Sequence, residues 1–153
     1  YIDESCAIYL NNASATVEGN IIDGGSGKRT TGIYCFGTCC PLITANTIEG
    51  GKGQKVGIPD VDDFCGAYGI RIQTAAPKIE ENRISNRYMA IDWYGIYEED
   101  ESSDPSSVLR NIFMSNGLGY LYYDEWSTAI LSLTTAITNS GNETLSAWGN
   151  SLQ

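Results

Sequence analysis

The sequence contains no histidine, and its nine lysine and arginine residues face 19 aspartate and glutamate residues. Without histidine, histidine acid–base chemistry, histidine-ligated metals and Ser-His or Cys-His nucleophile pairs are excluded. The net charge of −10 argues against nucleic acid as a partner, because phosphate binding needs clustered basic residues, and none follows Arg110. No apolar run approaches the roughly 18 residues of a spanning helix, so we expect no membrane span.

Charged residues of both signs make up only 18% of the chain, whereas glycine, threonine, serine, asparagine and alanine are plentiful. This composition is typical of stacked strands and tight turns rather than of amphipathic helices. At 153 residues the chain is long enough for one domain with a continuous core.

A short pattern recurs four times: a β-branched residue, two spacers, asparagine, one spacer and an apolar residue. The copies are residues 17–22, 43–48, 79–84 and 108–113. Their asparagines, Asn20, Asn46, Asn82 and Asn111, lie 26, 36 and 29 positions apart. A repeat of this length, built of strand-like pieces, indicates a solenoid.

A second short strand precedes each asparagine and places an isoleucine in the same phase, at Ile8, Ile33, Ile70 and Ile96. One turn therefore has two or three short strands, which favours a parallel β-coil whose turns stack about 4.8 Å apart. We expect these isoleucines to form one internal column. A second column is predicted from Val17, Ile43, Ile79 and Val108. A leucine-rich repeat would need Leu-x-x-Leu-x-Leu spacing, and a β-sandwich would not place asparagine at one phase.

The four asparagines are interpreted as structural. At a bend, asparagine tolerates left-handed backbone conformations and can satisfy open backbone groups. Stacked in consecutive turns, their amides can also bond one another as a ladder.

These Gly-Ile and Ile-x-x-Asn-x-Ile repeats resemble the right-handed parallel β-helix of the pectate-lyase superfamily. They are particularly similar to uncharacterised bacterial surface and periplasmic repeat proteins. The resemblance implies an all-β, right-handed parallel β-helix of about four to five turns with three sheets, and a site on an outer sheet face or in a long loop. Fold alone does not specify a reaction.

We expect one domain over residues 1–153, with regular turns in 6–113 and an irregular or capping region in 114–153. Residues 147–152 keep the asparagine, as Asn150, and form a weaker fifth copy. Because the pattern is already running at Ile8, the chain is expected to be a fragment of a longer protein.

Two acidic segments interrupt the repeat. Asp60, Asp62 and Asp63 lie in an insertion and could hold Ca²⁺, which takes six to eight oxygen ligands, or belong to a solvated loop. Residues 98–104 form a second acidic run, interpreted as a solvated loop or as part of a shared cation site.

Nine of the 16 aromatic residues fall between residues 88 and 126. An exposed aromatic ring beside carboxylates can bind a sugar, since the ring covers the apolar sugar face and the carboxylates accept hydroxyl protons. The alternative is a cap that packs across the end of the coil. The candidate ligand-binding residues are Trp93, Tyr94, Tyr97, Glu98, Glu99 and Tyr122.

All five cysteines lie in the first 65 residues, and their spacing fits no zinc site. We expect a disulfide between Cys35 and Cys39 or Cys40, or one to an adjacent turn. Such a bridge predicts export to the periplasm, cell surface or medium.

Two functions remain open. The favoured hypothesis is a non-catalytic surface module that presents loops to a polysaccharide, a cation or a protein. The alternative, which follows from the resemblance, is a polysaccharide lyase that uses Ca²⁺ and an Arg or Lys base. Arg71, which projects outward between Ile70 and Ile72, is the candidate base.

Overall fold

The computed structural model describes residues 4–53, 66–85, 93–100, 103, 107–114, 118–121, 143–145 and 151–152. Every regular element in these residues is a β-strand. The described residues therefore include no helix that could cross a membrane.

Three main sheets run along the molecule. The first contains β1 (Glu4–Asn11), β5 (Arg29–Phe36), β9 (Gly66–Gln73), β12 (Trp93–Glu98) and β15 (Leu118–Leu121) in that order. The second contains β2 (Thr16–Glu18), β6 (Leu42–Thr44), β10 (Lys78–Glu80) and β13 (Ser107–Leu109). The third contains β3 (Ile21–Asp23), β7 (Thr47–Glu49), β11 (Arg83–Ser85), β14 (Ile112–Met114), β16 (Glu143–Leu145) and β17 (Ser151–Leu152). A small fourth sheet joins β4 (Ser26–Gly27) to β8 (Lys52–Gly53).

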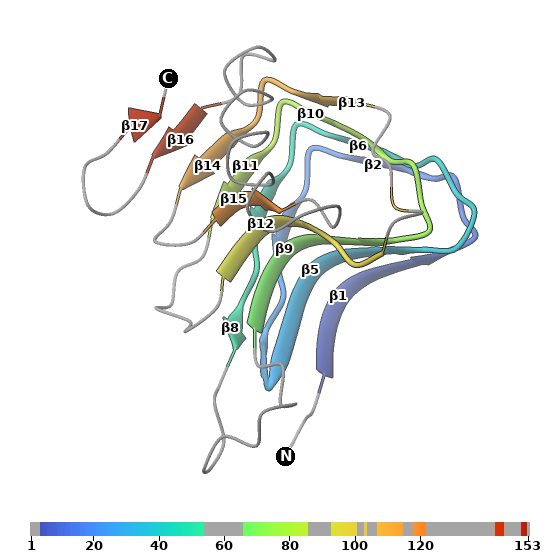
Figure 1. Cartoon of the computed structure of the whole chain (residues 1–153), viewed down its shortest axis with the longest axis horizontal. Coiled ribbons are helices and arrows are strands. Elements are labelled where there is room, and N and C mark those ends of the chain that lie inside the picture. Colours follow the sequence, from blue (N-terminus) through green and yellow to red (C-terminus); the bar gives the residue numbers. More distant parts are fainter. Residues whose placement is uncertain are drawn as a thin grey trace.

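The chain visits the three main sheets in turn, and each of the first four rungs contributes one strand to each sheet. Neighbouring strands pair in parallel, β1 with β5, β2 with β6 and β3 with β7 in the first two rungs. Figure 1 shows the rungs side by side, from β1 in blue to β12 in yellow. The predicted parallel β-helix with three principal sheets is confirmed.

Inward side chains stack in columns along the axis. The register aligns Ile8, Ile33, Ile70 and Ile96 in the first sheet. In the second sheet it aligns Val17, Ile43, Ile79 and Val108. Both predicted columns are confirmed, and a third runs through Ile22, Ile48 and Ile84. Because alternation sends every second side chain inward, identical phases in successive rungs produce one continuous hydrophobic core.

The long strands of the first sheet bend where Gly32 and Gly69 stack. A Cβ on Gly69 would lie 2.5 Å from Cγ2 of Ile84, and one on Gly32 would lie 2.6 Å from Cγ2 of Ile48. Both glycines therefore lie where another sheet approaches too closely for a side chain. The bend also changes the phase of the strand, so that Ala67 and Ile70 both belong to the core while Tyr68 faces outward.

The four repeat asparagines form a continuous hydrogen-bonded ladder. Nδ2 of Asn20 donates to Oδ1 of Asn46 (3.2 Å), and Nδ2 of Asn46 to Oδ1 of Asn82 (3.0 Å). The next step, from Asn82 to Asn111, is 3.0 Å. Each of these Oδ1 atoms also accepts the backbone N–H of the preceding ladder residue. The ladder satisfies backbone groups at the turn between the second and third sheets, and its three later members are buried.

The left-handed backbone at this turn belongs to the residue before each asparagine, not to the asparagine as predicted. Gly19, Ala45, Glu81 and Arg110 have φ between 53° and 67°. The asparagine itself must point inward to reach the next rung, so the preceding residue makes the bend. Only Gly19 among these four adopts that conformation without a steric cost.

The third sheet continues past β14 with β16, which pairs in parallel and aligns Thr144 with Phe113. β17 then pairs antiparallel with β16. The described end of the weaker fifth copy predicted at residues 147–152 does not continue the parallel sheet, because Ser151 and Leu152 return along β16.

Candidate functional site

The outer face of the first sheet carries most of the described aromatic side chains. In each rung the residue directly after the core isoleucine faces outward, and the register aligns Tyr9, Tyr34, Arg71 and Tyr97 in one column. A neighbouring column aligns Tyr68 with Tyr94. Four consecutive strands, about 14 Å at the usual spacing between strands, therefore present one surface.

We call this surface the aromatic strip, defined as Tyr9, Tyr34, Phe36, Tyr68, Tyr94 and Tyr97. At one end, the ring of Tyr9 lies 5.3 Å from that of Tyr34 and 6.3 Å from that of Phe36. At the other, Tyr68 and Tyr94 stack at 5.6 Å with an interplanar angle of 10°, and Tyr97 lies 5.1 Å from each. These separations are those of favourable aromatic pairs, so the rings hold one another in place.

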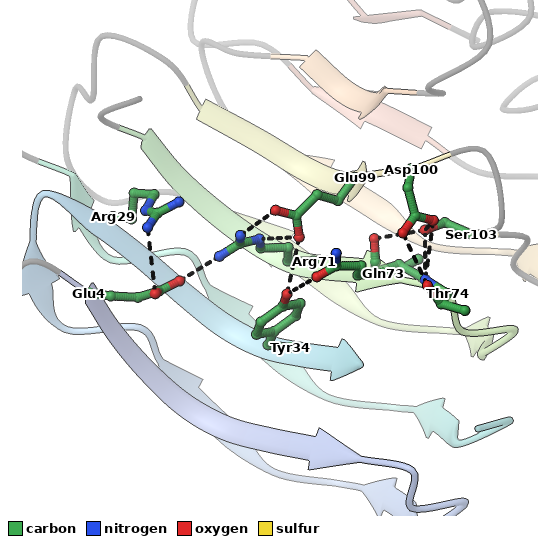
Figure 2. A network of polar contacts seen from close by, with 10 residues as sticks. Glu4, Arg29, Tyr34, Arg71, Gln73, Thr74, Glu99, Asp100 and Ser103 are labelled. Atoms are coloured by element: carbon green, nitrogen blue, oxygen red, sulfur yellow. Dashed lines mark hydrogen bonds and ion pairs between the residues drawn. The ribbon is translucent and has the colours of Figure 1, made fainter. Parts of the chain in front are cut away.

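Arg71 joins the two halves of the strip. Its guanidinium carbon lies 4.4 Å from the ring centroid of Tyr34 and 5.8 Å from that of Tyr68. Figure 2 shows the guanidinium between two carboxylates, with Nε and Nη2 bonded to Glu99 (3.0 and 2.5 Å) and Nη1 to Glu4 (2.5 Å). Such a bidentate, charge-assisted pair fixes Arg71 in one orientation.

Arg71 is suited to hold charge in place rather than to take up a proton. Burial alone would lower its pKa, but hydrogen bonds and the charge of Glu99, together with Tyr34 and Glu4, raise the pKa overall. A guanidinium is already the least readily deprotonated side chain. Arg71 lies on the outer face, where its side chain is only 7% exposed and is held by Glu99 and Glu4. Its role as a lyase base stays a prediction that these contacts do not support.

Two further groups complete the network. The hydroxyl of Tyr34 donates to Oε1 of Gln73 (2.5 Å) and lies 3.1 Å from Oε2 of Glu99. Burial raises the pKa of Tyr34, so its hydroxyl stays protonated and remains a donor. Arg29, from the strand next to β1, lies 3.7 Å from Oε2 of Glu4. The strip thus combines ring faces with the carboxylate oxygens of Glu4 and Glu99, which Figure 2 shows on either side of Arg71.

The described residues of the acidic run, 98–100 and 103, are packed against the neighbouring rung rather than solvated as predicted. Asp100 accepts the backbone N–H of Thr74 (3.2 Å), and the hydroxyl of Ser103 donates to the carbonyl of Ile72 (2.9 Å). Glu98, predicted to contact ligand, is 5% exposed and aligns with inward-facing Ile72. Glu98 is therefore not available at the outer face, because it is the last residue of β12 and strand alternation turns its side chain inward.

Among the described cysteines, the predicted disulfide does not form, and Cys6, Cys35, Cys39 and Cys40 are free thiols. Cys65 lies outside the described residues, so a bridge that involves it stays a prediction. The side chain of Cys35 points into the core between Leu10 and Ile72, whereas Cys40 is exposed, so the two point in different directions. Burial raises the pKa of Cys35 and Cys39, which favours the protonated thiol over the reactive thiolate in both.

Several predicted site residues lie outside the described part of the chain. These are Tyr122, Asp60, Asp62 and Asp63, together with the side chain of Trp93. The predictions made for them stay predictions. Among the residues that are described, no three cysteine or acidic side chains gather as a metal site would require.

A comparison with known protein families matches residues 2–144 to the family described as a right handed beta helix region. The chain belongs to this family. No curated protein and no solved structure matches the chain. Membership in the right-handed β-helix family accounts for the coil but names no ligand or reaction, so the outer-face geometry has to carry the functional argument.

Sequence reasoning located Tyr94, Tyr97 and Glu99 but missed the other half of the strip. Tyr9, Tyr34 and Phe36 lie in the first two rungs, where aromatic residues are sparse along the chain. The signal was present as the residue following each core isoleucine, because equal phase in successive rungs becomes adjacency in space. In a solenoid, the number of aromatic residues in one stretch of sequence does not show which side chains lie together on an outer face.

Proposed function

We propose that this right-handed β-helix domain is a non-catalytic carbohydrate-binding module, and that the aromatic strip is its binding surface. The observation that carries this proposal is the continuity of the strip, which joins aromatic rings of four rungs through Arg71. Aromatic faces bind the apolar faces of sugar rings, and neighbouring carboxylates accept hydroxyl protons. Because the strip extends across four strands, about 14 Å, it is long enough to contact several consecutive sugars of a polysaccharide rather than one.

The accessible rings are the ones expected to contact the ligand. Tyr9 is 53% exposed, and Tyr34, Phe36, Tyr94 and Tyr97 are partly exposed. Tyr68, which is 3% exposed, supports its neighbours instead. Because the rings are already packed against one another, little side-chain freedom is lost on binding, which favours affinity.

The lyase alternative receives no support from these contacts. A base must lose its proton near neutral pH, whereas the pKa of Arg71 is raised by its partners although burial opposes this. Export to the periplasm, cell surface or medium stays a prediction that now rests on the proposed ligand, since the four described thiols are free.

The test is binding of the protein to a panel of soluble polysaccharides, measured by isothermal titration calorimetry. For a glycan that binds, Tyr9→Ala and Tyr97→Ala should each weaken binding about 3- to 10-fold, as loss of one aromatic contact does. Ile21→Ala is the matched control, because Ile21 is a 90% exposed apolar residue of the first rung on another sheet. Failure to bind any glycan, or equal loss with Ile21→Ala, would refute the proposal.

A further inference from the structure

Each of the three guanidinium nitrogens of Arg71 is already bonded to one of the protein's own carboxylates, and the side chain is only 7% exposed. Nε and Nη2 are bonded to Glu99, and Nη1 is bonded to Glu4. One of its faces is covered by the ring of Tyr34 at 4.4 Å. Recognition of a carboxylate by arginine depends on the same fork of donors, so Arg71 is already occupied by the protein's own carboxylates.

The accessible charges along the strip do not attract an anion, because positive and negative side chains neutralise one another there. The side chains of Glu4 and Glu99 are 42% and 26% exposed. Arg29, at 38%, is drawn to within 3.7 Å of Glu4. Two carboxylates and two guanidiniums therefore cancel locally, while the whole chain carries a net charge of −10. A polyanion would meet carboxylate oxygens at the surface and a repulsive long-range field.

We propose that the aromatic strip selects uncharged, hydroxyl-rich glycans and rejects uronate polymers, and that Glu4 is a specificity-determining residue. This inference rests on the proposed carbohydrate-binding function. Neutral sugars supply hydroxyl donors to the oxygens of Glu4 and Glu99 and apolar faces to the rings. A uronate supplies a carboxylate that must lose its hydration and finds no free cationic partner in this network.

The site discriminates by using Glu4 as an internal substitute for a ligand carboxylate. Glu4 lies on the first strand and bonds Arg71 on the third, across Arg29 on the second (Figure 2). Removing its charge while keeping an acceptor oxygen would leave both guanidiniums in place with one carboxylate fewer. The local charge would then favour an anionic ligand.

The experiment compares each neutral glucan that binds with its C6-oxidised derivative, which has the same linkages and one carboxylate on each oxidised sugar. Calorimetry at about 20 mM salt keeps electrostatic effects unscreened. The wild-type protein should bind the oxidised polymer on the order of tenfold more weakly, since like charges oppose each other. Equal or tighter binding of the oxidised polymer would overturn this inference and leave the proposed function standing.

Glu4→Gln is the diagnostic variant. It should raise the ratio of the affinity for the oxidised polymer to the affinity for the neutral glucan about threefold or more, because one repelling carboxylate is removed. Glu18→Gln is the matched control, because it removes the same negative charge from an exposed residue of the second sheet. Its ratio of the two affinities should stay at the wild-type value. If both variants raise the ratio equally, net charge rather than Glu4 sets the selectivity, and the specificity role is wrong. If no glycan binds at all, the proposed function itself fails.

Discussion

Replacing Asn82 with alanine is expected to lower the free energy of unfolding by about 3 kcal/mol. The side chain is 1% exposed. Its Oδ1 accepts the backbone N–H and Nδ2 of Asn46 at 3.0 Å each, and its Nδ2 reaches the carbonyl of Ile43 at 2.9 Å and Oδ1 of Asn111 at 3.0 Å. Truncation removes all of these contacts at once.

The expected loss of unfolding free energy comes mainly from the polar groups that Asn82→Ala would leave buried without a partner. The buried N–H of Asn46 would lose its acceptor, which costs about 1–3 kcal/mol. The remaining amide contacts contribute roughly 1 kcal/mol in net terms, because the unfolded chain forms equivalent bonds with water. Asn20→Ala is the matched control. Asn20 is exposed in the first rung, and its Nδ2 bonds only the carbonyl of Glu18 and Oδ1 of Asn46 among described residues, so we expect a loss below about 1 kcal/mol.

Equilibrium urea unfolding followed by circular dichroism measures both variants. An unchanged urea dependence with a lower midpoint for Asn82→Ala would fit the ladder account. A loss below about 1 kcal/mol for Asn82→Ala, or an equal loss for Asn20→Ala, would refute the reasoning that burial within the ladder gives asparagine its structural role.

Three further changes test the coil. Ile70→Ala should cost about 2–5 kcal/mol in urea unfolding, because the isoleucine is fully buried in the core; a loss under 1 kcal/mol would mean the register is wrong. Ala45→Gly should stabilise the protein by about 0.5–1 kcal/mol, because φ is 54° there; destabilisation would contradict that strain. A hydrogen bond from Ser107, opposed by burial and aided by Lys78, lowers the pKa of Glu80, so its contribution to stability is present above the unfolded pKa and is lost as acid protonates it. Ser107→Ala should therefore lose less stability than wild type between about pH 5 and 3, and equal losses would exclude this linkage.

The sequence was sufficient to predict the coil because one physical rule generates it. Strand alternation places Ile33, Ile70 and Ile96 inward, and equal phase stacks them. The same rule, applied to the residue after each isoleucine, would have predicted the column that contains Tyr34, Arg71 and Tyr97.

Other features depend on geometry that the repeat does not encode. Glu98 was assigned to a loop because acidic runs are usually solvated, whereas β12 extends through it and turns it inward. The end of the coil was also misplaced. β16 aligns Thr144 with Phe113, so the third sheet continues beyond the last predicted regular turn, with a threonine where the preceding rung has an aromatic residue.

Nuclear magnetic resonance of protein labelled in the tyrosine rings tests most directly whether the aromatic strip binds carbohydrate. Titration with a neutral oligosaccharide, from any polysaccharide that binds, should shift the ring signals of Tyr9, Tyr94 and Tyr97 together and saturably. These three rings belong to opposite halves of the strip, so a common titration curve would indicate one ligand across it. Shifts confined to tyrosines outside the strip, or unchanged ring signals at saturating ligand, would contradict the account.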